Sequence, residues 1–299
     1  MTDYHLPVLL KEAVDGLNIR PDGVYVDVTF GGGGHSREIL KRLGPEGKLF
    51  AFDQDEDALS NVIDDPRFQL IHQNFRLMNR FLRFYGYRKV DGILGDFGVS
   101  SHQFDMPERG FSTRFDAVLD MRMNKNDELT AKKIVNEYEE TRLREVLSQY
   151  GELRSAAGMA RVIVSARKTQ PIETTEDLKK VLERFLPAHR QNKLLAQVYQ
   201  ALRIEVNQEL EALKEFLMQT AEVLNPGGRI SLISYHSLED RLVKRFIRNG
   251  MFEGEPEKDV YGNVEVPFKA VGKLIIPSEE EIEKNNRARS AKLRIGEKL

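Results

Sequence analysis

The hydrophobic residues of this chain follow two kinds of pattern. Short apolar runs, bounded by glycine or polar residues, occur at residues 24–30, 48–53, 68–72, 90–96 and 229–235. Runs of this length, rich in valine, isoleucine, leucine and phenylalanine, are typical of strands buried on both faces of a parallel sheet. Helical patterns, with apolar residues three and four positions apart, separate most of the runs. This alternation predicts an α/β fold of the Rossmann-like type.

Between residues 106 and 208 the strand-like runs stop. Helical patterns take over at 130–138, 141–150, 155–169 and 175–185, and again from 192 onward. We therefore expect an inserted all-helical domain at 106–208 and a core domain formed by 1–105 together with 209–299. The basic residues of the insertion suit either an ordinary solvated helix surface or a face that contacts phosphates.

Four consecutive glycines, Gly31–Gly34, follow the first apolar run, and a helical pattern follows them at once. Glycine lets the backbone approach a ligand closely, and a helix N-terminus offers unpaired N–H groups. The next run ends in Asp53, which lies 53 − 33 = 20 residues after Gly33, about the spacing of an acid that binds a ribose. The pattern predicts a nucleotide-type site, and a tight strand-to-helix turn without a ligand is the alternative.

Two glycine motifs compete for this stretch. The dinucleotide fingerprint G-x-G-x-x-G, started at Gly31, fails because Ser36 occupies the position of its last glycine. The methyltransferase motif D-x-G-x-G-x-G fits better, as Asp27-x-Thr29-x-Gly31-x-Gly33, with Thr29 in place of the first glycine. The pattern therefore favours a methyltransferase cradle over a dehydrogenase site.

Other side chains follow predicted strands at the sheet edge that faces ligands in such folds. Asp96 ends the fourth run, where amino-methylating enzymes carry an acidic or amide residue facing the target nitrogen; a strand-end turn is the alternative. Phe75 would either stack near an adenine or pack in the core. His236 follows the fifth run and is a candidate for the wall of the site. Ser237 and Asp240 suggest a capping box there, which would only begin a helix.

The composition narrows the chemistry. The 299 residues carry a net charge of −2, so attraction to nucleic acid requires local clusters of positive charge. The chain has no cysteine, which excludes disulfides, cysteine metal sites and reactions that need a thiolate. Neither a signal peptide nor a membrane-length apolar run is visible, so we expect a cytoplasmic protein without a membrane partner.

The stretch 285–294 near the C-terminus is basic and has little apolar content. It suits either a solvated tail or an arm that lies on nucleic acid. In the second case Arg289, Lys292 and Arg294 would contact phosphates.

Taken in order, a series of short stretches resembles the RsmH (MraW) family of bacterial ribosomal RNA methyltransferases. The stretches are His5-x-Pro-Val-Leu-Leu-x-Glu12, Phe30-Gly-Gly-Gly-Gly-His-Ser36, Gly98-Val-Ser-Ser101 with Gln103, Arg109-Gly-Phe-Ser112, Leu119-Asp-Met-Arg-Met123, Gln200-Ala-Leu-Arg-Ile204, Pro226-Gly-Gly-Arg229, His236-Ser-Leu-Glu-Asp240 and Arg289-Ser-Ala-Lys-Leu-Arg294. Because they span nearly the whole chain, the resemblance is highly specific. It departs locally at Phe97, at His102 and at Asp116-Ala-Val.

The resemblance implies S-adenosylmethionine-dependent methylation of N4 of a cytidine in the decoding region of 16S ribosomal RNA. It further implies a class I methyltransferase core, a helical insertion that helps to recognise RNA, the small ribosomal subunit as partner, and a monomer or homodimer. Carried onto the matching positions, the cofactor contacts are Gly33, Gly34, His35, Asp53, Phe75, Asp96 and Gln103. Asp96 would accept from the target amine, and His236 is the second catalytic candidate.

The missing cysteine agrees with this chemistry. Methylation of cytosine at carbon needs covalent attack by a thiolate, whereas methylation at nitrogen needs only in-line transfer. Two other classes remain open from the residues alone: a nicotinamide dehydrogenase, which the failed fingerprint disfavours, and a non-catalytic RNA-binding protein of the same fold. Whether NADH or S-adenosylmethionine raises the melting temperature tests the first class. Methyl transfer to RNA would exclude the second.

Overall fold

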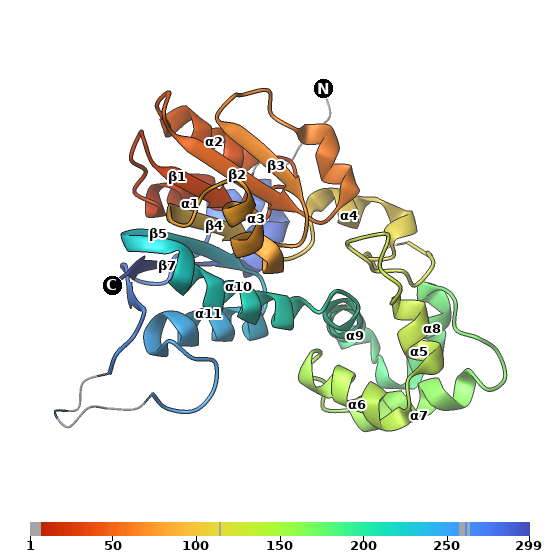
Figure 1. Ribbon diagram of the computed structural model, residues 1–299. Coiled ribbons are helices and arrows are strands. Elements are labelled where there is room, and N and C mark those ends of the chain that lie inside the picture. The colour runs from red at the N-terminus through yellow and green to blue at the C-terminus, as the bar shows by residue number, and fades with distance from the viewer. Residues whose placement is uncertain (1–6, 114, 257–260, 262–263) are drawn as a thin grey trace. The chain divides into compact units, whose positions relative to one another are not determined.

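The computed structural model describes residues 7–113, 115–256, 261 and 264–299. His5, the first residue of the N-terminal stretch considered above, lies outside the described residues. The chain divides into two compact units, one formed by Met1–Gly98 with Leu210–Leu299 and the other by Val99–Glu209 (Figure 1).

The described residues of the first unit form a seven-stranded sheet. In spatial order its strands are β3 (Phe68–His72), β2 (Lys48–Asp53), β1 (Val24–Asp27), β4 (Val90–Asp96), β5 (Leu224–Ser234), β7 (Lys292–Lys298) and β6 (Phe268–Ala270). Strands β1 to β5 are parallel, whereas β7 runs antiparallel to both β5 and β6. This arrangement confirms the expected Rossmann-like α/β core.

Helices cover both faces of this sheet because successive strand residues point to opposite sides. Val26 and Ile93 belong to one buried cluster with Phe216, while Tyr25 and Leu94, their chain neighbours, belong to another. The helical segments of the unit are α1 (Leu10–Gly16), α2 (Gly34–Arg42), η1 (Glu56–Asn61), η2 (Phe75–Leu77), α3 (Met78–Phe84), α10 (Glu209–Val223), α11 (Ser237–Asn249), α12 (Glu279–Lys284) and η6 (Asn286–Ser290).

The second unit is helical, and its described residues contain one isolated β-bridge, between Val118 and Thr174, and no strand. Its helical segments are α4 (Ser101–Asp105), η3 (Pro107–Arg109), α5 (Ala131–Glu137), α6 (Glu140–Gln149), α7 (Ala156–Ala166), α8 (Thr175–Leu182), η4 (Glu183–Phe185), η5 (Ala188–Arg190) and α9 (Gln191–Asn207). The unit begins before residue 106 because Val99 and Phe104 pack against its own buried core.

Helices α9 and α10 are separated at Gln208, which adopts a left-handed φ of 49°. The basic C-terminal stretch is not a solvated tail, and its contact with nucleic acid stays a prediction. It enters the sheet as β7, where Leu293 is fully buried and pairs with Ile233. Among the described residues, no helix is long and apolar enough to cross a membrane.

Candidate functional site

The glycine turn connects β1 to α2 at the carboxyl edge of the parallel strands. Gly33 is the N-cap of α2 with a left-handed φ of 73°, and no side chain caps the helix. A methyl group added to Gly31 would meet no atom within 4 Å. The first-turn N–H groups and the open space above Gly31 together form a cradle suited to a ligand with acceptor oxygens.

Gly34 has a different reason to be glycine. A Cβ atom there would lie 2.1 Å from Cγ of Pro7, so the first turn of α2 packs directly against the N-terminal segment. At Gly33 an added Cβ would lie 2.5 Å from an Arg37 guanidinium nitrogen and 2.8 Å from the Phe30 ring. Close packing therefore accounts for both glycines, and their contact with a cofactor stays a prediction.

Asp27 is the last residue of β1 and is fully buried. Its carboxylate accepts a 2.6 Å hydrogen bond from the Ser36 hydroxyl and a 3.1 Å bond from the Thr29 N–H. Burial, only partly offset by these bonds, raises its pKa to about 6. In the sequence, Asp27 is recognisable only as the first position of the methyltransferase motif, with no role assigned to it.

Asp53 ends β2 beside the glycine turn. Oδ2 accepts the Gly31 N–H at 2.8 Å, and Oδ1 accepts the Asp55 N–H at 2.9 Å. Desolvation raises the pKa of Asp53 to about 6. Asp55 in turn caps η1, whose first turn is acidic. Asp53 thus holds the turn while each carboxylate oxygen keeps a lone pair for a ligand.

Asp96 ends β4, the strand that neighbours both β1 and β5. Its backbone N–H donates to the Thr29 hydroxyl at 2.6 Å, and Oδ1 accepts from the hydroxyl of Tyr235 at 2.8 Å. Burial raises the pKa of Asp96 to about 6, against the opposing effects of His35 and Tyr235. Burial and the Asp96 carboxylate also raise the pKa of Tyr235 well above its usual value, so that the phenol stays protonated. Sequence reasoning missed Tyr235.

His35 lies in the first turn of α2 and is buried. Nε2 lies 3.2 Å from the Val8 carbonyl oxygen, and Nδ1 lies 4.0 Å from Oδ2 of Asp96. Desolvation lowers the pKa of His35, which favours the neutral ring. Because a carbonyl only accepts, Nε2 carries the hydrogen that points toward Val8.

The other predicted cofactor contacts have different surroundings. Phe75 is half-buried among aromatic rings, with ring centroids 5.8 Å from Phe97 and 5.4 Å from Phe216. This packing is that of a core residue, and stacking of Phe75 on an adenine stays a prediction. Gln103 belongs to the second unit, where its Oε1 accepts the Ser100 N–H at 3.1 Å.

The structure corrects the assignment of the capping box near β5. His236 is the N-cap of α11, and its partner is Glu239 rather than the predicted pair Ser237 and Asp240. Nδ1 of His236 accepts the Glu239 N–H at 3.4 Å, and Nε2 lies 3.1 Å from Oε1 of Glu239. The imidazole is thus held by the helix start, and Asp240 is free for a different role.

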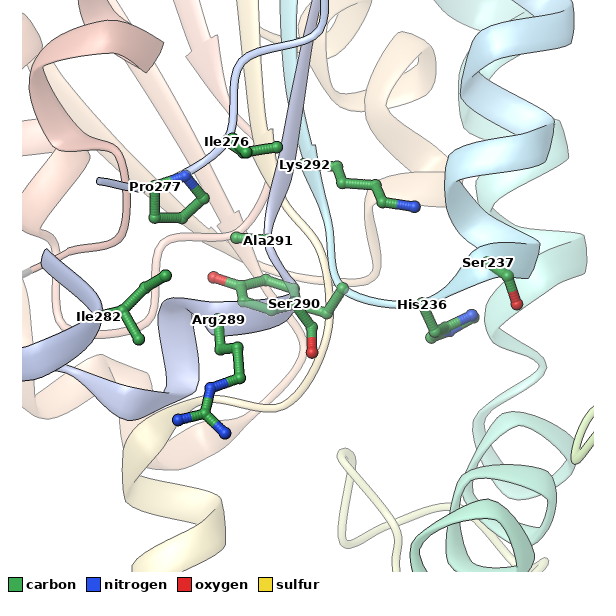
Figure 2. Close-up of a pocket in the computed structure, with 10 residues that line it drawn as sticks. His236, Ser237, Ile276, Pro277, Ile282, Arg289, Ser290, Ala291 and Lys292 are labelled. Carbon is green, nitrogen blue, oxygen red and sulfur yellow. The ribbon is translucent and has the colours of Figure 1, made fainter. Parts of the chain in front are cut away.

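Asp240 interacts with two of the three cations that were predicted to contact RNA. Arg294 forms an ion pair with Asp240 at 2.7 Å, and the Lys292 ammonium lies 3.5 Å from the same carboxylate. Arg289 is exposed on η6 and, with Lys292 and His236, lines a pocket of about 340 Å³ (Figure 2).

Comparison with known proteins agrees with this architecture. Residues 2–299 match the MraW methylase family. Proteins named ribosomal RNA small subunit methyltransferase H are similar over their full length: those of Christiangramia forsetii (68% identical, covering 100% of this chain and 99% of the relative), Flavobacterium johnsoniae (68%, covering 99% and 98%) and Flavobacterium psychrophilum (70%, covering 97% and 100%). This chain therefore belongs to the MraW methylase family.

Proposed function

We propose that this protein transfers a methyl group from S-adenosylmethionine to the N4 amino group of a cytidine in the decoding region of 16S ribosomal RNA. Membership of a methylase family supports the reaction class. The relatives' names support the small-subunit RNA as substrate. The small ribosomal subunit is then the partner, and the cytoplasm is where the two would meet.

The residues at the carboxyl edge of the sheet fit the proposed cofactor. Burial disfavours the charged forms of Asp27, Asp53 and Asp96 and raises their pKa values to about 6, and neither Asp27 nor Asp53 forms an ion pair with another described residue. A ligand with a positive charge would relieve that cost. We assign Asp53 to the ribose hydroxyls and the open amides at the start of α2 to the amino-acid carboxylate.

S-adenosylmethionine, when bound, supplies a methyl group on a positively charged sulfur. The protein must activate the other partner, since a cytosine amine is a weak nucleophile whose lone pair is delocalised into the ring. A carboxylate that accepts the amine N–H localises this lone pair and stabilises the positive charge that develops on nitrogen. We assign that role to Asp96.

The observation that carries this assignment is the setting of Asp96 at the end of β4. Its pKa of about 6 leaves it ionised at neutral pH and still basic enough to take a proton from the methylated amine. The Tyr235 hydroxyl fixes Oδ1 and leaves Oδ2, on the His35 side, to accept from the substrate. His236, engaged by Glu239, remains the reserve candidate for the proton acceptor.

The decisive experiment is transfer of a tritiated methyl group to small subunits that lack the modification, followed by nuclease mapping of the product. Label in N4-methylcytidine from the decoding region is the expected result. Label at another atom or in another region would refute the finer assignment, and absence of transfer with intact cofactor binding would favour a non-catalytic RNA-binding protein.

A further inference from the structure

The pocket next to Tyr235 has walls of two kinds. Ile276, Pro277 and Ile282 form an apolar side, with Ile276 64% exposed. Arg289 and Lys292 contribute positive charge, and the serines 237 and 290 line it as well. Figure 2 shows Ile276, Pro277 and Ile282 across the pocket from His236 and Ser237. A ligand that is both flat and apolar on one side and anionic on the other suits such a surface.

Charge is unevenly distributed in this pocket. Lys292 shares Asp240 with Arg294, so its charge is partly balanced. Arg289 forms no ion pair within the described part of the chain. Arg289 is therefore the cation that an incoming anion would meet with the least competition.

The backbone that carries Arg289 is firmly held. Its neighbour Ala288 is fully buried, and Ala291 is nearly so. Asn285 caps η6 by accepting the Arg287 N–H, and Leu293 exchanges two backbone hydrogen bonds with Ile275, the chain neighbour of Ile276. The pocket is thus framed by ordered main chain, which lowers the entropic cost of binding.

Tyr235 links this pocket to the proposed reaction centre. Its side chain lines the pocket, and its hydroxyl donates to Asp96 at 2.8 Å. We propose that the pocket holds one nucleotide of the substrate RNA strand, with its phosphate on Arg289 and its base against Ile276, Pro277 and Ile282. This inference rests on the proposed function, because it makes the pocket the place where the strand is held beside Asp96.

The first arm of the test uses small probes on the full chain. Methyl NMR signals of Ile276 and Ile282 should shift on titration with cytidine 5′-monophosphate, and much less with cytidine. Arg289→Ala should weaken the binding of the monophosphate about tenfold. The matched control is Arg88→Ala, since Arg88 is also exposed and has no ion pair among the described residues. Unmoved methyl signals, or equal titration by Arg289→Ala and wild type, would overturn the inference.

The second arm uses small subunits that lack the modification. Arg289→Ala should raise KM about tenfold while kcat stays within about threefold. The slope of the logarithm of the binding constant against the logarithm of the salt concentration should become shallower by up to about 0.7 to 0.9. Monophosphate binding with an unchanged KM would mark a free-nucleotide site and contradict the RNA assignment. If wild type transfers no methyl group, the proposed function fails, while the small-probe arm still tests whether the pocket takes a nucleotide.

Discussion

The hydroxyl of Tyr235 donates a 2.8 Å hydrogen bond to Oδ1 of Asp96, although the two residues lie 139 positions apart in the sequence. The pairing of β4 with β5 places the two strand ends side by side, with Asp96 opposite Ile233. This bond lowers the pKa of Asp96 against a larger, opposite effect of burial. Tyr235 therefore tunes and orients the acid that we assign to the target amine.

Tyr235→Phe should shift the acidic limb of the pH–rate profile upward by about one unit. Loss of the hydrogen bond removes an effect that lowers the pKa of Asp96, and a bond to a charged group is worth about 1.5–3 kcal/mol. The measurement is single-turnover methyl transfer between pH 5 and 8. Tyr87→Phe is the matched control, since no hydrogen bond of its hydroxyl occurs among the described residues. An unshifted profile would make Tyr235 a packing residue only.

Cofactor affinity should increase as pH rises from about 5 to 7. Asp27, Asp53 and Asp96 have pKa values of about 6, above their usual 3.8, so they are largely protonated at pH 5 and largely ionised at pH 7. A cationic ligand favours the ionised forms and releases protons when it binds. Calorimetry in buffers of different ionisation enthalpy measures this release. S-adenosylhomocysteine, which lacks the sulfonium charge, should show a weaker dependence; equal, flat profiles for both ligands would argue against the acidic edge as the cofactor site.

The same pKa shifts affect the stability of the free protein. Since the folded pKa of Asp27 is raised, its contribution to stability is fully present below about pH 4 and is lost as pH rises through about 6. Asp27→Asn should therefore flatten the pH dependence of the unfolding free energy over this range by about 1–3 kcal/mol. Urea unfolding at pH 4.5 and pH 7 tests this expectation. If the unfolding free energy changes by the same amount between the two pH values in variant and wild type, the expectation is contradicted.

Asp53→Ala should weaken S-adenosylmethionine binding by about 1.5–3 kcal/mol, the range for a hydrogen bond to a charged group. Because Asp53 also accepts the Gly31 N–H, part of the loss would come from a looser turn. Asp53→Asn keeps an acceptor there and separates the two contributions. Asp64→Ala, at an exposed aspartate nearby in sequence, serves as the control. Unchanged affinity in a folded Asp53→Ala variant would remove Asp53 from the cofactor site.

Gly34→Ala should destabilise the fold by about 1–3 kcal/mol, since the new methyl group would overlap Pro7. The double variant Pro7→Ala with Gly34→Ala should recover much of that loss, because it removes the ring carbon that the methyl group meets. Thermal unfolding of the three variants tests the coupling. Strictly additive effects would show that the glycine is not required by this contact.

The sequence was informative where the determinants are local. Short contiguous patterns predict the parallel strands, the glycine turn, and the acids Asp53 and Asp96 at strand ends. The role of Tyr235 and the contact of Gly34 with Pro7 depend on residues brought together only by the fold.

The strand β7 was missed for a different reason. Apolar Leu293 and Ile295 alternate with polar Lys292 and Arg294, as in a strand, but the stretch 285–294 is basic overall. Its place depends on antiparallel pairing with β5, which no local pattern indicates. The boundary of the helical unit was likewise displaced, because Val99 and Phe104 join its core through long-range packing.

The central claim is that the Asp96 carboxylate activates the target amine, and Asp96→Asn tests it most directly. Asparagine keeps the shape and a carbonyl acceptor but loses the charge and the capacity to take a proton. At saturating S-adenosylmethionine, single-turnover methyl transfer to small subunits that lack the modification should fall roughly 10²–10⁴-fold, with Asp64→Asn unchanged. A saturated rate within a few-fold of wild type would contradict the claim and leave Asp96 a residue that only positions the cofactor.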